Sequence, residues 1–278
     1  MAYQTLLAHL PDENDTNGVL DVATALAERH GAHLTGLHIL PRIDLQSIYG
    51  MPLALSREIE ARRRAIAATL GERFEAATRT GDFVTEWRVV DGAETSLERA
   101  LTALGNTADL IVVGQAYDTG QRGARSELNA RVLGAAGRPL LLVPPERRGE
   151  SVGERVFVAW DGQRAATRAV FGALPALVRA ESVRLQRINT PSRDRDHALG
   201  ATEMLADTLS RHGVNVELFH SDAREGEIGV ELLRFAEDWG ADLIVSGGQE
   251  QGALREFLFG STTQHLLERT RVPLLMSS

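Results

Sequence analysis

The residues best suited to binding chemistry lie between Gly240 and Met276, where an apolar strand, a glycine-rich turn and a helix start follow one another. The strand is Leu243 to Val245. The turn contains Gly247, Gly248 and Gly252, and the helix opens with Gly260, Ser261 and Thr262. Glycines let backbone N–H groups approach a ligand closely, and a helix start adds unpaired donors and a partial positive charge. The stretch therefore predicts an anion site, suited to phosphate.

The same helix start also fits a local role. Ser261 and Gln264 have the spacing of a capping box, in which each side chain bonds a backbone N–H at the beginning of the helix. Local chemistry alone leaves helix capping and phosphate binding open.

A second polar position follows an earlier apolar strand, Arg155 to Trp160, and reads Asp161-Gly162. The aspartate fits either an Asx turn leading into a helix from Arg164 or a contact to a ligand. In a parallel sheet this position and Gly247 meet at the carboxyl edge of the strands, where ligands bind. The predicted site therefore combines both stretches.

No constellation for catalysis accompanies these residues. All 30 basic residues are arginine, so a Walker P-loop lysine and a lysine nucleophile are excluded, and the absence of cysteine excludes thiolate chemistry. Ser261 and His265 share a helix face, but no third group is placed to orient the histidine. We expect no catalytic residue and no metal site.

The composition of the chain limits the classes of binding partner and the cellular location that we expect. A net charge of −8 argues against nucleic acid and anionic membranes. The N-terminus lacks the pattern of a signal peptide, and no apolar run approaches the ~18 residues of a membrane span. We expect a cytoplasmic protein.

The elements that position these residues come from an internal repeat. Ala108 to Val112 returns as Ala241 to Val245, and a proline-apolar strand closes each copy. The polar stretch 144–153 separates the copies, which predicts two domains, 1–146 and 154–278.

Apolar runs alternate with helical patterns in both copies, which is typical of parallel α/β sheets. The expected strands are Thr5–Leu10, His33–Leu40, Phe83–Val90, Leu110–Gly114, Leu140–Val143, Arg155–Trp160, Val183–Ile188, Val214–His220, Leu243–Val245 and Pro273–Met276. The expected helices are Val19–Arg29, Ser56–Thr78, Leu97–Leu104, Arg164–Val178, Asp196–His212, Ile228–Trp239 and Thr262–Thr270. The segment Pro41 to Pro52 is an irregular insertion in the first copy.

The arrangement resembles the universal stress protein family. Its nucleotide-binding members carry Gly-x-x-Gly, nine residues, then Gly-Ser or Gly-Thr; Gly247 and Gly260-Ser261 match, whereas Glu250 replaces the second glycine. The stretch from Val158 to Arg164 is similar to the family's first-strand motif, whose aspartate contacts adenosine.

The resemblance implies two tandem doubly wound sheets, each with five parallel strands in the order 3-2-1-4-5, of the Rossmann-like, adenine nucleotide alpha hydrolase-like type. It also implies a stress-related binding or signalling role, with ATP or a related adenine nucleotide held by the second copy and at most slow ATP hydrolysis. A carboxylate at Glu250 would lie near the phosphates and weaken binding, and Mg should help by screening that charge.

The first copy departs from the motif. Pro11 stands at the aspartate position, and Ser126-Glu127, or Glu127-Leu128 if the repeat offset is 133, stands where Gly-Ser is expected. A glutamate at that helix start would repel phosphate, so we expect one nucleotide per chain at most.

Two other functions remain open, a structural or partner-binding module in which the glycines serve only the turn, and an adenylate-cleaving enzyme on the same fold.

Each copy also ends in an apolar strand with an unpaired edge. We expect Leu140–Val143 to pair antiparallel with Leu274–Met276, forming an internal pseudo-dimer, and a homodimer is a further expectation.

Overall fold

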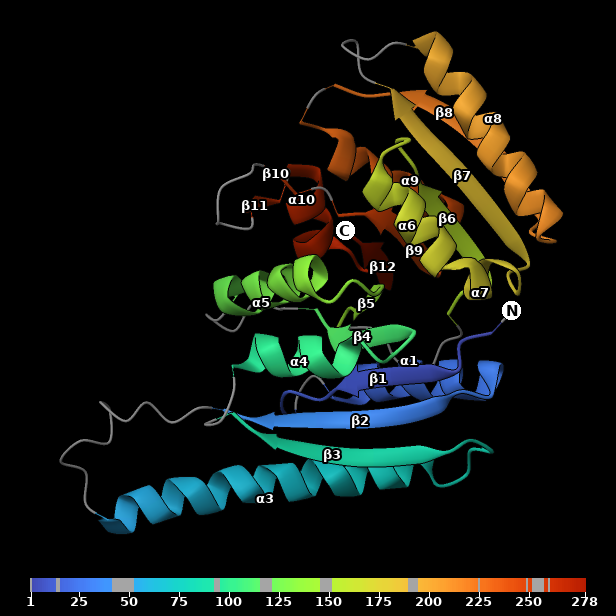
Figure 1. Ribbon diagram of the computed structural model, residues 1–278. Helices are drawn as coiled ribbons and strands as arrows, with labels where there is room; N and C mark the ends of the chain where they lie inside the picture. Colours follow the sequence, from blue (N-terminus) through green and yellow to red (C-terminus); the bar gives the residue numbers. More distant parts are fainter. Residues whose placement is uncertain are drawn as a thin grey trace.

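One continuous sheet runs through the computed structural model of the chain (Figure 1). The structure describes residues 2–13, 16–41, 53–92, 96–115, 122–145, 152–189, 195–224, 226–248, 250–251, 258–259 and 261–278. The insertion after Pro41, the turn residue Gly252 and the helix-start residue Gly260 lie outside these ranges.

The strands of the large sheet fall into two groups of five within the described residues. The first group is β1 (Thr5–His9), β2 (His33–Leu40), β3 (Thr85–Asp91), β4 (Leu110–Gly114) and β5 (Leu140–Val143). The second is β6 (Arg155–Ala159), β7 (Ser182–Asn189), β8 (Val216–Asp222), β9 (Leu243–Gly247) and β12 (Leu274–Ser277). The order across the sheet is β3-β2-β1-β4-β5-β12-β9-β6-β7-β8, so each group has the predicted order 3-2-1-4-5.

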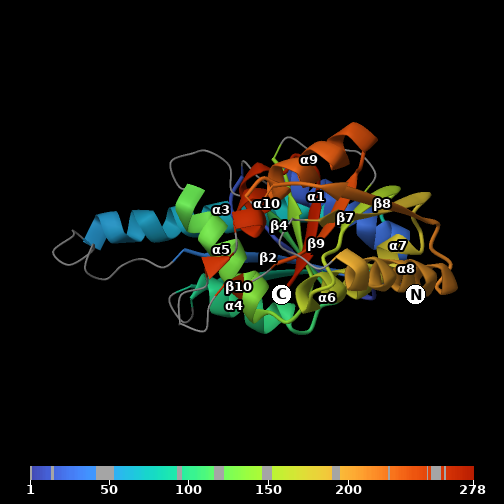
Figure 2. The same ribbon diagram turned by 90° about the horizontal axis from the view of Figure 1, so that it is seen from above.

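Helices cover both faces of this sheet. One face carries α1 (Thr16–His30), α3 (Leu53–Thr78), α6 (Arg164–Gly172), α7 (Leu174–Leu177) and α8 (Arg195–Arg211). The other carries α4 (Leu97–Gly105), α5 (Arg122–Ala135), α9 (Ile228–Trp239) and α10 (Ser261–Arg269). Figure 2 shows α6 and α9 on opposite sides of β9. The α/β class is therefore confirmed, and the double cover explains why the central strands are apolar on both faces.

The two groups join through β5 and β12, which pair antiparallel as predicted. Leu142, Leu141 and Leu140 lie opposite Leu274, Leu275 and Met276, and all are buried. Each strand thereby covers the open edge that the other copy would leave.

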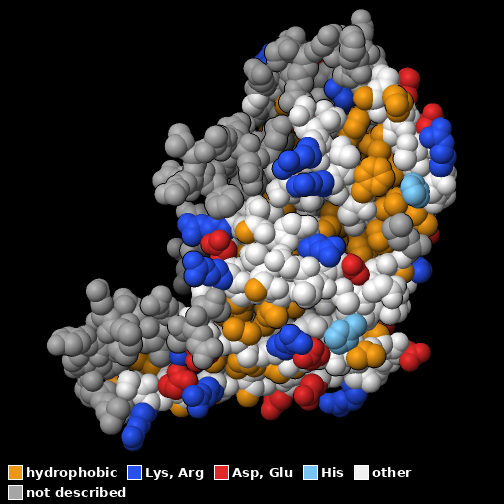
Figure 3. All heavy atoms as spheres, in the orientation of Figure 1, with side chains coloured by type: hydrophobic (Ala, Val, Ile, Leu, Met, Phe, Trp, Pro, Cys, Tyr) orange, Lys and Arg blue, Asp and Glu red, His pale blue; other side chains and the backbone are white. Residues whose placement is uncertain are grey.

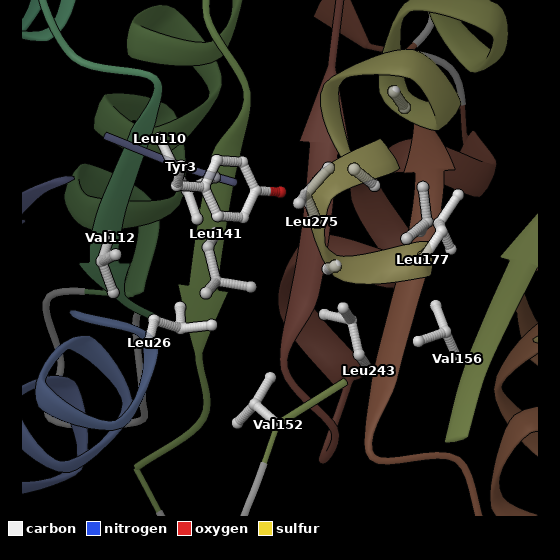
Figure 4. Close-up of a cluster of buried hydrophobic side chains, with 14 of the residues drawn as sticks. Tyr3, Leu26, Leu110, Val112, Leu141, Val152, Val156, Leu177, Leu243 and Leu275 are labelled. Carbon is white, nitrogen blue, oxygen red and sulfur yellow. The ribbon is translucent and has the colours of Figure 1, made fainter. Parts of the chain in front are cut away.

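The core continues across this junction. Figure 4 shows Leu110 and Leu141 of the first copy in the same cluster as Leu243 and Leu275 of the second, with the hydroxyl of Tyr3 directed towards the second copy. That hydroxyl donates a hydrogen bond to the carbonyl of Gly172 (3.0 Å). Neither copy therefore packs independently of the other.

The repeated Ala-Asp-Leu-Ile-Val segment has a structural role. The Asp109 carboxylate accepts hydrogen bonds from the backbone N–H groups of Gln4 and Thr5. Asp242 does the same for the backbone N–H groups just before and at the start of β6 (2.9 to 3.1 Å). Each aspartate fixes the start of the first strand of its copy against the fourth.

Several elements differ from the sequence-based expectations, and three of the differences lie in the second copy near the candidate site. The helix expected over Arg164–Val178 is split into α6 and α7 at Gly172, which packs against Pro139, and Pro175 lies in the first turn of α7. The strand expected to end at Val245 continues to Gly247, because Ser246 and Gly247 pair with β12. A two-stranded hairpin, β10 (Glu250–Gln251) with β11 (Leu258–Phe259), precedes α10 and was not expected.

The surface of the described residues mixes charges. Figure 3 shows arginine and acidic side chains interspersed over the face that it draws, with apolar side chains between them. No helix in the described ranges has the length and apolar character to cross a membrane.

Candidate functional site

A pocket opens at the carboxyl ends of β6, β7 and β9. The empty space in the pocket and at its open mouth amounts to about 710 Å³. Its walls are Ala159, Trp160, Asp161, Gln163, Ala165, Ala166, Gln186, Ile188, Ile228, Leu232, Ser246, Gly247, Thr262 and Thr263. The chain leaves β6 for β7 on one side and returns through β9 on the other, so the pocket lies at a switch point of the sheet, the usual ligand position in this architecture.

The turn after β6 forms one wall. The Asp161 Oδ1 atom accepts a hydrogen bond from the backbone N–H of Gln163 (2.9 Å), so the Asx turn is confirmed. Gly162 adopts φ of +81°, which favours glycine, and Gln163 is the N-cap of α6. Asp161 therefore shapes the start of α6 and also lines the pocket; a ligand contact at its carboxylate stays a prediction.

Gly247 lines the pocket, and the structure gives a reason for a glycine here that the sequence did not indicate. A Cβ atom at this position would lie 2.3 Å from the backbone nitrogen of Ala166. The glycine therefore lets the first turn of α6 approach the end of β9. Its neighbour Gly248 is buried and donates its N–H to the carbonyl of Ser277 (2.8 Å), so this N–H is engaged in the sheet and is not offered to a ligand.

The start of α10 forms the opposite wall. Ser261 is the first residue of this helix and is exposed, and Thr262 and Thr263 line the pocket. The Gln264 amide donates to Glu268 on the next turn (2.9 Å). The predicted phosphate contact at Gly260 lies outside the described residues, and for Glu250 the structure describes the backbone, which pairs with Phe259.

Two helices begin at this pocket. Ala165 and Ala166 belong to the first turn of α6, and Thr262 and Thr263 to that of α10. Helix starts carry unpaired N–H groups and a partial positive charge, so this side suits an anion. Ile188, Ile228 and Leu232 add an apolar surface from β7 and α9, which suits a flat ring system.

Gln186 lines the pocket but was not predicted as a site residue. It lies in a largely buried segment of β7. Its side chain is 4% exposed, and its Nε2 atom donates to the Ser221 Oγ atom (3.0 Å) and to the Arg187 carbonyl (3.3 Å). A polar residue between Leu185 and Ile188 was the signal that could have identified it.

The first copy carries different residues at the positions that line the pocket in the second. The strand registers place His9, Leu37 and Val113 at the positions of Ala159, Gln186 and Ser246. Leu37 and Val113 are buried in the core, and the Asn129 amide donates to the Gly114 carbonyl (3.2 Å) where α5 meets the end of β4. Larger or apolar side chains therefore occupy the positions that leave space in the second copy. Ser126 and Glu127 lie in α5, with side chains outside the description.

The described residues contain no group of three histidine or acidic side chains that could hold a metal ion.

Comparisons with known proteins agree with this architecture. Residues 154–278 match the model of the universal stress protein family. A universal stress protein of Synechocystis sp. is 25% identical over 175 residues, which is 60% of this chain and 57% of that protein. The match thus spans little more than half of the relative's length.

Solved structures match along the whole chain. A universal stress protein from Archaeoglobus fulgidus superposes with a TM-score of 0.72 at 15% identity, covering 99% of this chain and 96% of the other. A functionally unknown protein from Pseudomonas aeruginosa gives 0.63 at 15% identity, with 99% and 92% covered. At this identity the likeness establishes the fold. Together the comparisons confirm the resemblance to the universal stress protein family.

Proposed function

We propose that this chain, whose residues 154–278 match the universal stress protein family, binds one adenine nucleotide in the pocket of its second copy and serves a stress-related binding or signalling role in the cytoplasm. The observation that carries the proposal is the pocket itself, which combines two helix starts with an apolar wall at the switch point of the sheet.

The residues present fit such a ligand. The base would lie against Ile188, Ile228 and Leu232, the adenosine part near Asp161, and the phosphates at the starts of α6 and α10, where Thr262 offers a hydroxyl. Mg would accompany the phosphates and screen neighbouring carboxylates. The proposal also includes two domains, 1–146 and 154–278, with a single nucleotide site per chain, in the second domain.

The first test identifies what the purified protein carries. Denaturation followed by mass spectrometry of the released small molecules should yield an adenine nucleotide. After its removal, calorimetric titration with ATP and Mg should give one site per chain, and ATP at ~100 times its dissociation constant should stabilise the fold by about 2.7 kcal/mol.

A matched pair of variants locates the site. Ala165→Leu places a larger side chain from the first turn of α6 in the pocket and should weaken ATP binding at least tenfold. Ala76→Leu makes the same change on an exposed position of α3 and should leave binding unchanged. Two sites per chain, or full binding by Ala165→Leu, would contradict the assignment.

A second candidate is a structural or partner-binding module. The observations that favour it are the packing role of Gly247 and the engaged N–H of Gly248, because both glycines then serve the fold itself. No released ligand and no ATP binding by wild-type protein, together with no gain from Glu250→Gly, would support this module. Light scattering tests the proposed homodimer.

A further inference from the structure

Among the described residues, the side-chain oxygen of Gln186, which lines the pocket, has no hydrogen-bond partner. The Gln186 side chain is held by its nitrogen, since Nε2 lies 3.3 Å from the Arg187 carbonyl oxygen, which can only accept a hydrogen bond. The Ser221 hydroxyl lies 3.0 Å from the same nitrogen. The contact with the Arg187 carbonyl fixes which end of the amide is the oxygen, because the reversed amide would place two acceptors against each other, and the Ser221 hydroxyl accepts from the same nitrogen.

The Oε1 atom therefore points away from both anchors. Within the described part of the chain it has no hydrogen bond, and it is not among the side-chain atoms that are sealed from solvent without a partner. Gln186 lines the pocket and is 4% exposed overall, so what remains accessible opens into that space. A buried carbonyl oxygen that lacks a partner favours a ligand with a matching N–H donor.

We infer that Gln186 is a specificity-determining residue, whose Oε1 atom accepts a hydrogen bond from the exocyclic amino group of a 6-aminopurine. This inference rests on the proposed nucleotide site. The neighbouring apolar residues Ile188, Ile228 and Leu232 place the base at this side of the pocket. A 6-oxopurine would set its own carbonyl oxygen against Oε1, and an unsubstituted purine would leave Oε1 unpaired.

The first copy supplies an internal comparison. Leu37 occupies the position of Gln186 and is fully buried, so a leucine fits this place in the same fold. Gln186→Leu is therefore expected to fold and to lose the acceptor. Ser221→Ala removes one of the two anchors of Nε2 and should let the amide leave its place more often, which weakens the hydrogen bond that Oε1 accepts from the ligand.

The test compares dissociation constants for ATP, for ITP and for purine riboside triphosphate, which lacks the amino group. Wild-type protein should bind ATP about tenfold more tightly than either analogue, the value of one buried hydrogen bond. Gln186→Leu should weaken ATP about tenfold and leave purine riboside triphosphate unchanged, so that the preference disappears. Ser221→Ala should reduce the difference between the dissociation constants for ATP and ITP. A purely structural role of Ser221 would weaken the binding of both equally. Thermal melts without ligand confirm that each variant is folded.

The outcomes separate this inference from the proposed function. Equal binding of ATP and both analogues by wild-type protein, or equal weakening of ATP and purine riboside triphosphate in Gln186→Leu, overturns the role of Gln186 while the nucleotide site stands. No binding of any of the three triphosphates by wild-type protein overturns both.

Discussion

Gly247 and Ala166 meet so closely that a Cβ atom on the glycine would lie 2.3 Å from the alanine nitrogen. The end of β9 and the first turn of α6 are therefore in direct backbone contact at Gly247, and both line the pocket. The shape of the candidate site depends on this contact before any ligand is considered.

Gly247→Ala should therefore destabilise the protein. The added methyl group meets backbone atoms, which cannot move aside as a flexible side chain does, and we expect a loss of about 1 to 3 kcal/mol in the free energy of unfolding. Urea unfolding measures it. Gly200→Ala is the matched control, since its Cβ would meet nothing within 4 Å, and it should be neutral or slightly stabilising in α8. Equal stability of Gly247→Ala and wild type would show that α6 yields freely.

Asp161 allows the turn and the ligand contact to be separated. Asp161→Ala removes the acceptor for the Gln163 N–H and should cost about 1 kcal/mol of stability. Asp161→Asn keeps an oxygen for that bond and should retain most of the stability. If the carboxylate also contacts adenosine, Asp161→Asn weakens ATP binding in calorimetric titration; unchanged binding would leave Asp161 a turn residue alone.

The fold was readable from the sequence for reasons that these residues make plain. The aspartates 109 and 242 recur because each fixes the start of a strand, so the repeat carried the topology with it. The pairing of β5 with β12 followed from two apolar strands that needed partners.

The site was less readable. Gly247 looks like a ligand-binding glycine until its contact with α6 is seen, and that helix is distant in the sequence. Gln186 stands in a strand whose two faces are both largely buried, so spacing alone could not tell whether it lined a pocket or paired within the core. The hairpin β10–β11 has two residues per strand, too few for a periodic signal.

His30 should make stability depend on pH. Its ring packs edge-on against Tyr3 with centroids 4.8 Å apart, and among the described residues neither ring nitrogen has a hydrogen-bond partner. Burial, followed by the charges of Arg179 and Arg29, lowers the pKa of His30 to about 4. The unfolded chain has a histidine pKa of about 6.5, so it binds the proton first.

The contribution of neutral, buried His30 to the free energy of unfolding is therefore fully present above pH ~6.5. It is lost as the pH falls towards 4, which lowers the free energy of unfolding by up to about 3 kcal/mol. Urea unfolding of wild type and His30→Phe at a series of pH values measures the difference, because other acidic transitions are common to both proteins. The exposed His212→Gln variant should follow wild type. Parallel pH profiles of wild type and His30→Phe would contradict the assignment.

The junction predicts how half of the chain behaves. Residues 152–278 alone would leave β12 without its neighbour β5, so that the backbone groups of Leu274 to Met276 on that side lose their antiparallel partners. An exposed, apolar strand edge is a template for pairing, and β12 can pair with its own copy in the antiparallel sense that it shows with β5. We expect this fragment to form dimers or larger assemblies in light scattering, with a mass that rises with concentration.

Adding a fragment of residues 2–145 should convert these assemblies into a complex of one copy of each, because β5 offers Leu140 to Leu142 in the native register. A second half that stays monomeric at every concentration, with cooperative unfolding, would mean that the second copy does not need the core shared across β5 and β12.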